Sequence, residues 1–260
     1  MTTPPEPPRG SRGARRPGRY VLFGLLLVLG LSGLAVAAIG IAHGMLPRQF
    51  TAAQRRQITD WEMARRWRAL TAGEIFPAAV SYTVSAGDLN ATTGLTLRAQ
   101  RLAISPAEGC SKAFDTAADR VLSQHRCTSV LRATYVDSSG SMVATIAVAV
   151  LPTGATASSV VGELAGASNG AAGSLQAFAV PGTPAAGFTD ADRQVSRAIG
   201  AGPYLILATA GFTTERHQQV SADQYVSREM LSFADGLVTS AQGAVGKQPP
   251  VPSCPGAPGC

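Results

Sequence analysis

The hydrophobic and polar positions of this chain separate a long apolar segment near the N-terminus from a region of mixed, periodic pattern. Residues 21–42 carry no charged side chain. As an α-helix this run would be about 33 Å long, which is enough to cross the hydrocarbon core of a bilayer. The pattern predicts a single transmembrane helix over residues 21–42. A cleaved signal peptide ending near residues 35–38 is the alternative, although the apolar core of such a peptide usually has only about 7–15 residues.

Beyond residue 70, alternating and continuous apolar stretches predict strands. The clearest feature is a hairpin, because residues 130–136 and 142–151 flank the turn sequence DSSGS. The second arm of this hairpin is apolar on both faces and should be a central strand. The other stretches with strand character are residues 81–84, 95–104, 175–180, 193–199 and 204–212.

Apolar residues at helical spacing predict three helices in the same region. The first starts at Ser111, the second opens at Ser158 or Ser159, and the third follows a capping box at residues 221–224. The buried stripe expected for the third helix is Val226, Met230, Phe233, Leu237 and Ala241. Paired strands punctuated by helices predict an α+β fold, an antiparallel sheet with helices packed on one face, in a domain spanning residues 71–248.

Three shorter parts surround the apolar run and the domain. Residues 1–20 are rich in Pro, Gly and Arg and have little to bury, which predicts a disordered cytoplasmic tail. Residues 43–70 hold both tryptophans of the chain among arginines, and Thr51 is placed to cap a helix there. This juxtamembrane helix either packs on the domain as a stalk or lies at the lipid headgroups. Residues 249–260 form a Pro/Gly tail.

Positive charge is concentrated before the domain. Residues 1–68 carry 11 Arg against 3 acidic residues, whereas residues 69–260 have a net charge of −2 within a chain of net charge +6. The arginines directly before the apolar run are Arg9, Arg12, Arg15, Arg16 and Arg19. Because the more positive flank of a transmembrane helix stays in the cytoplasm, we expect a single-pass protein of the cell membrane with its domain outside. A domain without an excess of basic residues is not expected to bind nucleic acid.

The four cysteines fall into two groups, with Cys110 and Cys127 in the domain and Cys254 and Cys260 in the tail. An even number outside the membrane predicts disulfides, although four cysteines allow three pairings. A Cys110–Cys127 bridge is favoured, because the helix between them is short enough for its flanking loops to bring the Cα atoms within about 7 Å. Cys254 and Cys260 are the second candidate pair. A zinc site is not expected, since the chain has no C-x-x-C and His125 beside Cys127 lacks further ligands.

Residues with catalytic potential are few. The chain has no H-E-x-x-H, no Walker loop and no G-x-G-x-x-G leading from strand to helix. Asp115 and Asp119 lie one helical turn apart, as paired general acids and bases can, but they lie opposite the apolar face, and surface carboxylates at this spacing usually form a solvated helix face. Asp190 and Asp192 beside Thr189 are expected to form a turn. We therefore predict no catalytic residue, no cofactor and no metal site.

Small residues recur along one face of the predicted transmembrane helix, at intervals of three or four positions. They are Gly30, Gly33, Ala37, Gly40 and Gly44. Such a face permits close approach of two membrane helices, so a homodimer through this helix is one expected interaction. The alternative is that Gly and Ala are simply common in membrane helices. Membrane lipid and an envelope protein are the other expected partners.

Three short sequences of the domain are similar to those of a known group: EIFP at 74–77, GCS at 109–111 and RCTSVLRATYVD at 126–137. They resemble an uncharacterised family of single-pass membrane proteins of actinobacteria, and the similarity runs from the anchor to the final helix. The resemblance implies a cell-envelope location and no established activity, so it transfers no site residues. The domain also resembles, more distantly, the disulfide-bearing extracellular domains of actinobacterial receptor kinases, but the kinase half is absent here.

These patterns predict a membrane-anchored extracytoplasmic domain that acts by binding, as an accessory or ligand-capturing part of the cell envelope, and not as an enzyme. The alternative is a membrane-tethered envelope hydrolase whose site is assembled from scattered residues. A pocket with a nucleophile in hydrogen-bond reach of a base would favour the enzyme. A shallow apolar patch or groove would favour the binding module.

Overall fold

A computed structural model describes residues 50–87, 92–167, 175–213 and 224–247. By its contacts the chain divides into two compact units, Met1–Thr51 and Ala52–Cys260, and nearly all described residues belong to the second unit. Within the described ranges, no helix is both long enough and apolar enough to cross a membrane. The predictions that lie outside these ranges are the tail at 1–20, the transmembrane helix at 21–42 with its small-residue face, and residues 249–260 with Cys254 and Cys260.

Pairs of strands are separated by helical segments along the second unit. The helical segments, with η for 3-10 helices, are α2 (Ala52–Ala69), α3 (Ala72–Ile75), η1 (Cys110–Lys112), α4 (Thr116–Gln124), α5 (Gly154–Ala167), η2 (Asp190–Asp192) and α6 (Gln224–Val245). The strands are β1 (Ala79–Val84), β2 (Leu95–Ile104), β3 (Ser129–Asp137), β4 (Met142–Val150), β5 (Arg193–Ala201) and β6 (Tyr204–Phe212).

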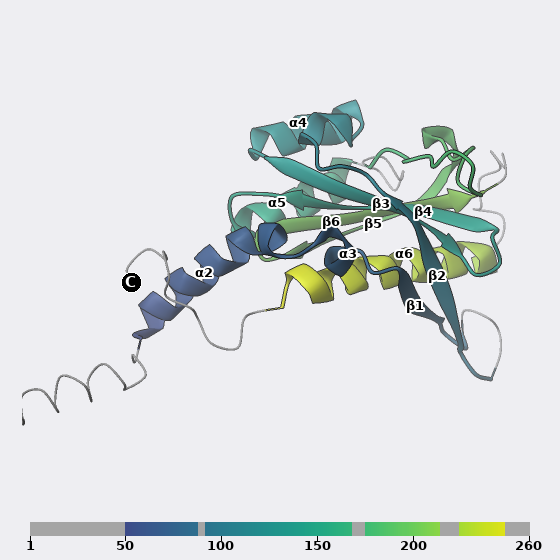
Figure 1. Ribbon diagram of the computed structural model, residues 1–260, viewed down its shortest axis with the longest axis horizontal. Helices are drawn as coiled ribbons and strands as arrows, with labels where there is room; N and C mark the ends of the chain where they lie inside the picture. The colour runs from purple at the N-terminus through teal and green to yellow at the C-terminus, as the bar shows by residue number, and fades with distance from the viewer. Residues whose placement is uncertain (1–49, 88–91, 168–174, 214–223, 248–260) are drawn as a thin grey trace, which may run out of the picture. The chain divides into compact units, whose positions relative to one another are not determined.

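The six strands form one sheet in the order β1-β2-β3-β4-β6-β5, and every neighbouring pair is antiparallel (Figure 1). This confirms the predicted α+β class with an antiparallel sheet. The predicted hairpin is also confirmed as β3 and β4. Gly140, with φ of 72°, supplies the left-handed residue that its tight turn requires. The two edges of the sheet are β1 and β5.

β4 shows why the sheet is covered on both faces, since all of its residues are buried. Ile146 belongs to the core shared with α6, whereas Ala147 and Ala149 of the same strand belong to a second core shared with α4 and α5. The prediction that the helices pack on one face is therefore wrong. A strand that is apolar on both faces needs a covering layer on each of them, and α6 supplies one layer while α4 and α5 supply the other.

The sheet curls around α6, so this helix contacts both edge strands as well as β4 and β6 (Figure 1). Phe233 of α6 packs against Tyr82 of β1, with ring centroids 5.3 Å apart. The buried side chains of the helix include four of the predicted stripe: Met230, Phe233, Leu237 and Ala241. Residues 221–223 of the predicted capping box lie outside the described part of the chain.

Residues 176–180, predicted as part of a strand, have no regular secondary structure. The segment crosses the face of the sheet instead of joining its edge. The Thr134 hydroxyl donates a hydrogen bond to the carbonyl oxygen of Phe178 (2.6 Å), and the Phe178 N–H donates to the Thr145 hydroxyl (2.9 Å). Buried threonines on two neighbouring strands thus replace the backbone ladder that the strand prediction assumed.

Two helices begin at positions other than predicted. α4 begins at Thr116 and not at Ser111, because the Asp115 carboxylate caps it. α5 begins at Gly154, after Thr153, whose hydroxyl accepts a hydrogen bond from an amide of the first turn. In both cases a polar side chain upstream of the apolar stripe sets the start of the helix.

α2 is attached to the rest of its unit through Tyr204 of β6, which is fully buried. The Tyr204 hydroxyl donates to the carbonyl oxygen of Met63 and accepts from the N–H of Trp67 (3.1 Å). In an uninterrupted α-helix these two backbone groups would bond to each other, so the hydroxyl is inserted into the hydrogen-bond ladder of α2. Arg66 also donates to the carbonyl oxygen of Ala244 in α6 (2.9 Å). These are the contacts of a helix packed on the domain.

Candidate functional site

An open groove of about 510 Å³ runs between β1 and α6. One side consists of residues 79–83 of β1. The side chains from α6 are small or polar: Ser232, Asp235, Gly236, Thr239 and Ser240. Because successive side chains of a strand point to opposite faces, a hollow bordered by five consecutive residues follows the backbone edge of the strand. We call this hollow the edge groove.

β1 directs unpaired backbone groups toward its open edge. The Arg101 N–H donates to the carbonyl oxygen of Ala78 (2.9 Å), which sets the phase of the antiparallel ladder with β2. In this phase the backbone groups of even-numbered residues point toward β2. Those of Ala79, Ser81 and Thr83 therefore point away from it. Three N–H donors and three carbonyl acceptors thus follow the edge.

The two edges of the sheet differ in how they are protected. β5 contains Arg193 and Arg197 and a register shift before Val195, and it lies between α5 and α6. Charges and irregularities of this kind prevent an edge from pairing with another chain. β1 has the sequence AVSYTV, without a charge, a proline or a register shift, and its Ser81 and Thr83 side chains are exposed. The fold therefore leaves β1 open to an additional strand.

The close approach of α6 to β1 depends on Gly236. A Cβ atom added at this position would lie 2.4 Å from the Cβ of Tyr82, closer than two such atoms can come. The missing side chain lets the helix lie directly over Tyr82. This approach forms the narrow side of the edge groove.

Tyr82 connects the groove to two carboxyl groups. Its hydroxyl is buried and has no hydrogen-bond partner among the described residues, and its side chain is only 3% exposed. Burial raises the pKa of this hydroxyl, and the charges of Asp137 and Glu229 raise it further. Glu229 lies two helical turns before Gly236 on the same side of α6. Of Tyr82, Asp137 and Glu229, only Tyr82 lines the groove itself, and Glu229 lies about one turn of α6 before the lining residue Ser232. We call these three residues the acidic end of the groove.

The carboxylates near the groove differ in their partners. Asp137 accepts a hydrogen bond from the Met142 N–H (2.7 Å), and Asp235 forms an ion pair with Arg197 of β5 (2.7 Å). For Glu229, the described residues provide no basic partner. Burial, followed by the neighbouring charge of Asp137, raises the pKa of Glu229. Glu229 is thus a half-buried acid without a counter-charge in the described part of the chain.

The raised pKa of Glu229 predicts how stability depends on pH. A carboxyl that ionises less readily in the folded chain stabilises the fold below its ordinary pKa of 4.5, and this contribution is lost as the pH rises through the raised value. Tyr82 of β1 and Asp137 of β3 are the titratable groups that face it. We expect Glu229→Gln to melt at a higher temperature than the wild type at pH 7, with the difference shrinking toward pH 4.5. Circular dichroism melts at the two pH values test this, and a variant that melts lower at pH 7 would contradict it.

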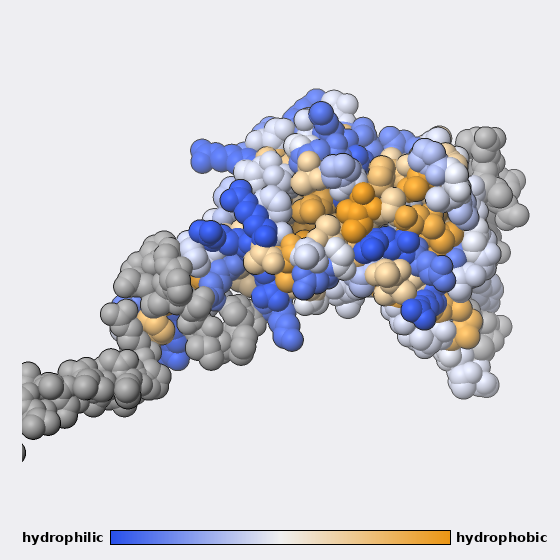
Figure 2. Space-filling model, in the orientation of Figure 1, coloured by the Kyte–Doolittle hydropathy of each residue, from blue (hydrophilic) through white to orange (hydrophobic). Residues whose placement is uncertain are grey.

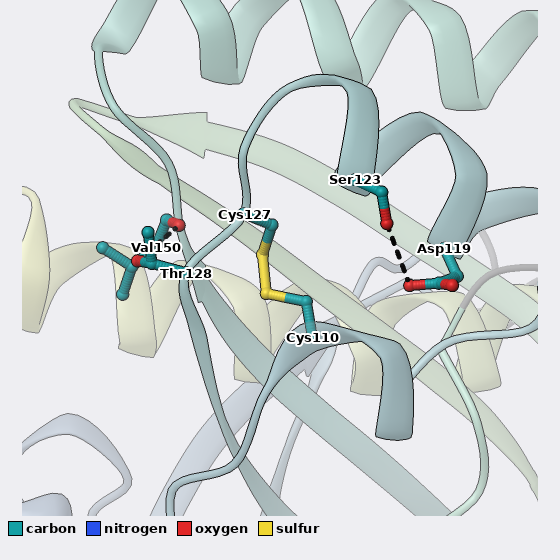
Figure 3. Close-up of a disulfide and its surroundings, with 6 residues drawn as sticks. All are labelled: Cys110, Asp119, Ser123, Cys127, Thr128 and Val150. Atoms are coloured by element: carbon teal, nitrogen blue, oxygen red, sulfur yellow. Dashed lines mark hydrogen bonds between the residues drawn. A yellow bond between two sulfur atoms is a disulfide. The ribbon is translucent and has the colours of Figure 1, made fainter.

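The predicted disulfide is confirmed, since Cys110 and Cys127 are bonded with their Cα atoms 6.1 Å apart (Figure 3). The bridge closes the loop that contains η1 and α4. Beside it, the Ser123 hydroxyl donates to the Asp119 carboxylate within α4 (3.5 Å). The bridge and α4 belong to the layer on the face of the sheet opposite α6, so the disulfide stabilises the outer layer and does not take part in the edge groove.

The other polar residues considered from the sequence have structural partners. Asp115 caps α4, and the Thr189 N–H donates to the Asp192 carboxylate (2.8 Å) in the predicted turn. His125 lies 2.7 Å from Glu163 of α5. Within the described ranges, no three or more His, Cys, Asp or Glu side chains gather as a metal ion would require.

The sequence GASNG at 166–170 has the spacing of a G-x-S-x-G motif, which the sequence analysis did not single out. In α/β-hydrolases this motif occupies the turn from a strand to a helix. Here its first two residues are the last residues of α5, and the serine lies outside the described part of the chain. The motif therefore follows a helix, which is not the setting of a nucleophile elbow.

The described surface has few fully exposed hydrophobic side chains. Figure 2 shows hydrophobic residues over the centre of one face and hydrophilic residues along α2. Among the large hydrophobic residues that the structure describes, only Leu95 and Tyr225 are exposed, at 49% and 50%. A broad apolar docking patch is thus a weaker candidate than the edge groove.

Sequence reasoning missed the edge groove, although one signal was available. β1 carries none of the charges or prolines that usually protect an edge strand, but its position at the edge is visible only in the folded sheet. Comparison of the chain with protein-family models, with curated proteins and with solved structures finds no match.

Proposed function

We propose that the chain is a membrane-anchored extracytoplasmic domain of the cell envelope that binds an extended polypeptide by adding it as a strand to β1. The observation that carries the proposal is the open edge of β1, where Ala79, Ser81 and Thr83 direct their backbone groups into the edge groove. Extended peptides bind free sheet edges in this way. Main-chain hydrogen bonds supply affinity, and pockets for alternate side chains supply specificity.

The dimensions of the groove fit a short strand. Five residues of β1 cover about 16 Å at the usual rise of a strand, so the bound segment has about five residues in contact. Each of the three outward-facing residues of β1 can exchange two hydrogen bonds with an antiparallel partner. α6 lies beside the added strand and presents three hydroxyl groups, a glycine and the Asp235 carboxylate.

The location outside the membrane is supported by the sequence and by the disulfide. The apolar run at residues 21–42 and the arginines before it favour an anchor with the domain on the far side. The Cys110–Cys127 bridge favours an oxidising compartment.

Binding fits the groove better than hydrolysis does. A hydrolase would need a nucleophile within hydrogen-bond reach of a base. The groove offers the hydroxyls of Ser232, Thr239 and Ser240, but the carboxylate in its lining, Asp235, is paired with Arg197. Among the residues that the structure describes, those that line the groove include no histidine, cysteine or lysine.

The test removes a single outward-facing N–H from β1. Ser81→Pro leaves the ladder with β2 intact, because the Ser81 N–H points away from β2, and proline is tolerated at such edge positions. We expect peptides selected from a displayed octapeptide library on the full chain in detergent to bind the variant at least about tenfold more weakly, which is about 1.4 kcal/mol. Titration of labelled peptides by fluorescence anisotropy measures the change.

Ser81→Ala is the matched control, since it keeps the N–H and removes only an outer-face hydroxyl. This control should bind as the wild type does. Thr83→Pro is a second variant of the same kind, in case Ser81→Pro lowers the melting temperature. Equal binding by the wild type and by folded proline variants would overturn the proposal, and so would a library that yields no binding peptide.

A further inference from the structure

We infer that the polypeptide added to β1 carries a basic side chain, lysine or arginine, that reaches the acidic end of the edge groove and pairs with Glu229. The inference rests on the proposed function and names the chemistry of the partner. Three features support it: the direction of side chains on an added strand, the missing counter-charge of Glu229, and the buried hydroxyl of Tyr82.

An added strand directs every second side chain toward α6. Residues side by side on neighbouring strands point to the same face of a sheet. Val80, Tyr82 and Val84 point into the core beneath α6, whereas Ser81 and Thr83 are exposed on the outer face. The partner residues beside Val80 and Tyr82 therefore point toward the helix.

A long side chain is needed to reach from this position to the acidic end. Glu229 precedes Gly236, the residue above Tyr82, by about 10 Å along the axis of α6. Lysine and arginine carry an apolar stem that can lie along the aromatic ring while the charged group extends beyond it. The positive charge is also attracted to the face of such a ring.

The charges at this end of the groove favour a cation. Burial raises the pKa of the Tyr82 hydroxyl and that of Glu229; the charge of Asp137 raises both pKa values further, and the charge of Glu229 adds to the effect on Tyr82. Negative charge at this end of the groove thus opposes the ionisation of Tyr82 and Glu229. An ammonium or guanidinium group placed among them would relieve this repulsion and would donate a hydrogen bond to the unpartnered hydroxyl of Tyr82. A partner with an acidic residue in this place would add a further negative charge.

Asp235 provides an internal comparison. It lines the same groove, but Arg197 already neutralises it at 2.7 Å. If proximity to any carboxylate were enough, both residues would attract a basic partner equally. Because Asp235 has a counter-charge and Glu229 has none among the described residues, the preference for a basic residue should depend on Glu229 and not on Asp235.

The test repeats the octapeptide selection on three full-length proteins in detergent: the wild type, Glu229→Gln and Asp235→Asn. Peptides selected on the wild type should share a lysine or arginine at one position. Replacing that residue by glutamine in the synthetic peptide should weaken binding to the wild type about tenfold. The same replacement should leave binding to Glu229→Gln unchanged, while Asp235→Asn should keep the preference of the wild type.

The outcomes separate this inference from the proposed function. Peptides that lose affinity on Ser81→Pro but show no preference for a basic residue would overturn the inference and leave strand addition standing. A preference that persists in Glu229→Gln would also overturn it, because the cation would then bind elsewhere. If the wild type forms a dimer that Ser81→Pro abolishes, a second copy occupies the edge. The inference then fails, since β1 contains no basic residue.

Discussion

Replacing Cys110 and Cys127 together by alanine is expected to lower the free energy of unfolding by about 3 kcal/mol. The bridge joins residues 17 apart in sequence, and closing a loop of this size restricts the unfolded chain by about that amount. For a folded unit of about 200 residues this corresponds to a fall in melting temperature of about 6–12 °C. The double replacement leaves no unpaired thiol at positions 110 and 127, so the measured change reports the loss of the bridge together with its sulfur contacts in the outer layer.

A reducing agent supplies the control for this prediction. It should lower the melting temperature of the wild type by a similar amount and leave that of the double alanine variant unchanged. A peptide mass map should show Cys110 linked to Cys127. An unchanged melting temperature in the variant, or a map that links Cys110 to the C-terminal cysteines, would contradict the structure.

Gly236→Ala is expected to destabilise the fold by about 2 kcal/mol and to lower the melting temperature by about 4–8 °C. The direction is opposite to helix propensity, since alanine is the better helix former by about 1 kcal/mol. The new Cβ would lie 2.4 Å from the Cβ of Tyr82, so α6 must move away from β1 or Tyr82 must shift. Thermal unfolding followed by circular dichroism measures the change.

Gly243→Ala is the matched control on the same helix. Its Cβ would meet no atom within 4 Å, and the position is exposed. This variant should gain only the stabilisation from the higher helix propensity of alanine, which should raise the melting temperature by about 2–4 °C. If both alanine variants were stabilised, the close approach of α6 to β1 would be refuted.

The strands could be predicted well because their patterns are local. The apolar and alternating stretches at 95–104 and 204–212 coincide with β2 and β6, and turn residues mark the hairpin between β3 and β4. The prediction of a strand at 175–180 was wrong, because this segment has a strand-like composition but covers a face of the sheet. Whether such a segment joins an edge or crosses a face depends on threonines on other strands, such as Thr134 and Thr145, and no local pattern records that.

The two covering layers could have been predicted from the sequence. The sequence predicts an arm at 142–151 that is apolar on both faces, which already requires helices on both sides, whereas the expectation of a single layer places α4 and α5 on the same face as α6. The edge groove, in contrast, could not be predicted from the sequence. It arises where Gly236 meets Tyr82, more than 150 positions away in the sequence, and where β1 lies at an edge.

The contrast between the two sheet edges limits how far copies of this domain can assemble. Within the described sheet β5 is closed by its arginines, its register shift and its covering helices, so two copies that pair through sheet edges would join β1 to β1. Such a joint is two-fold symmetric and uses the β1 edge of each copy, so edge-to-edge growth of the described sheet would stop at two copies.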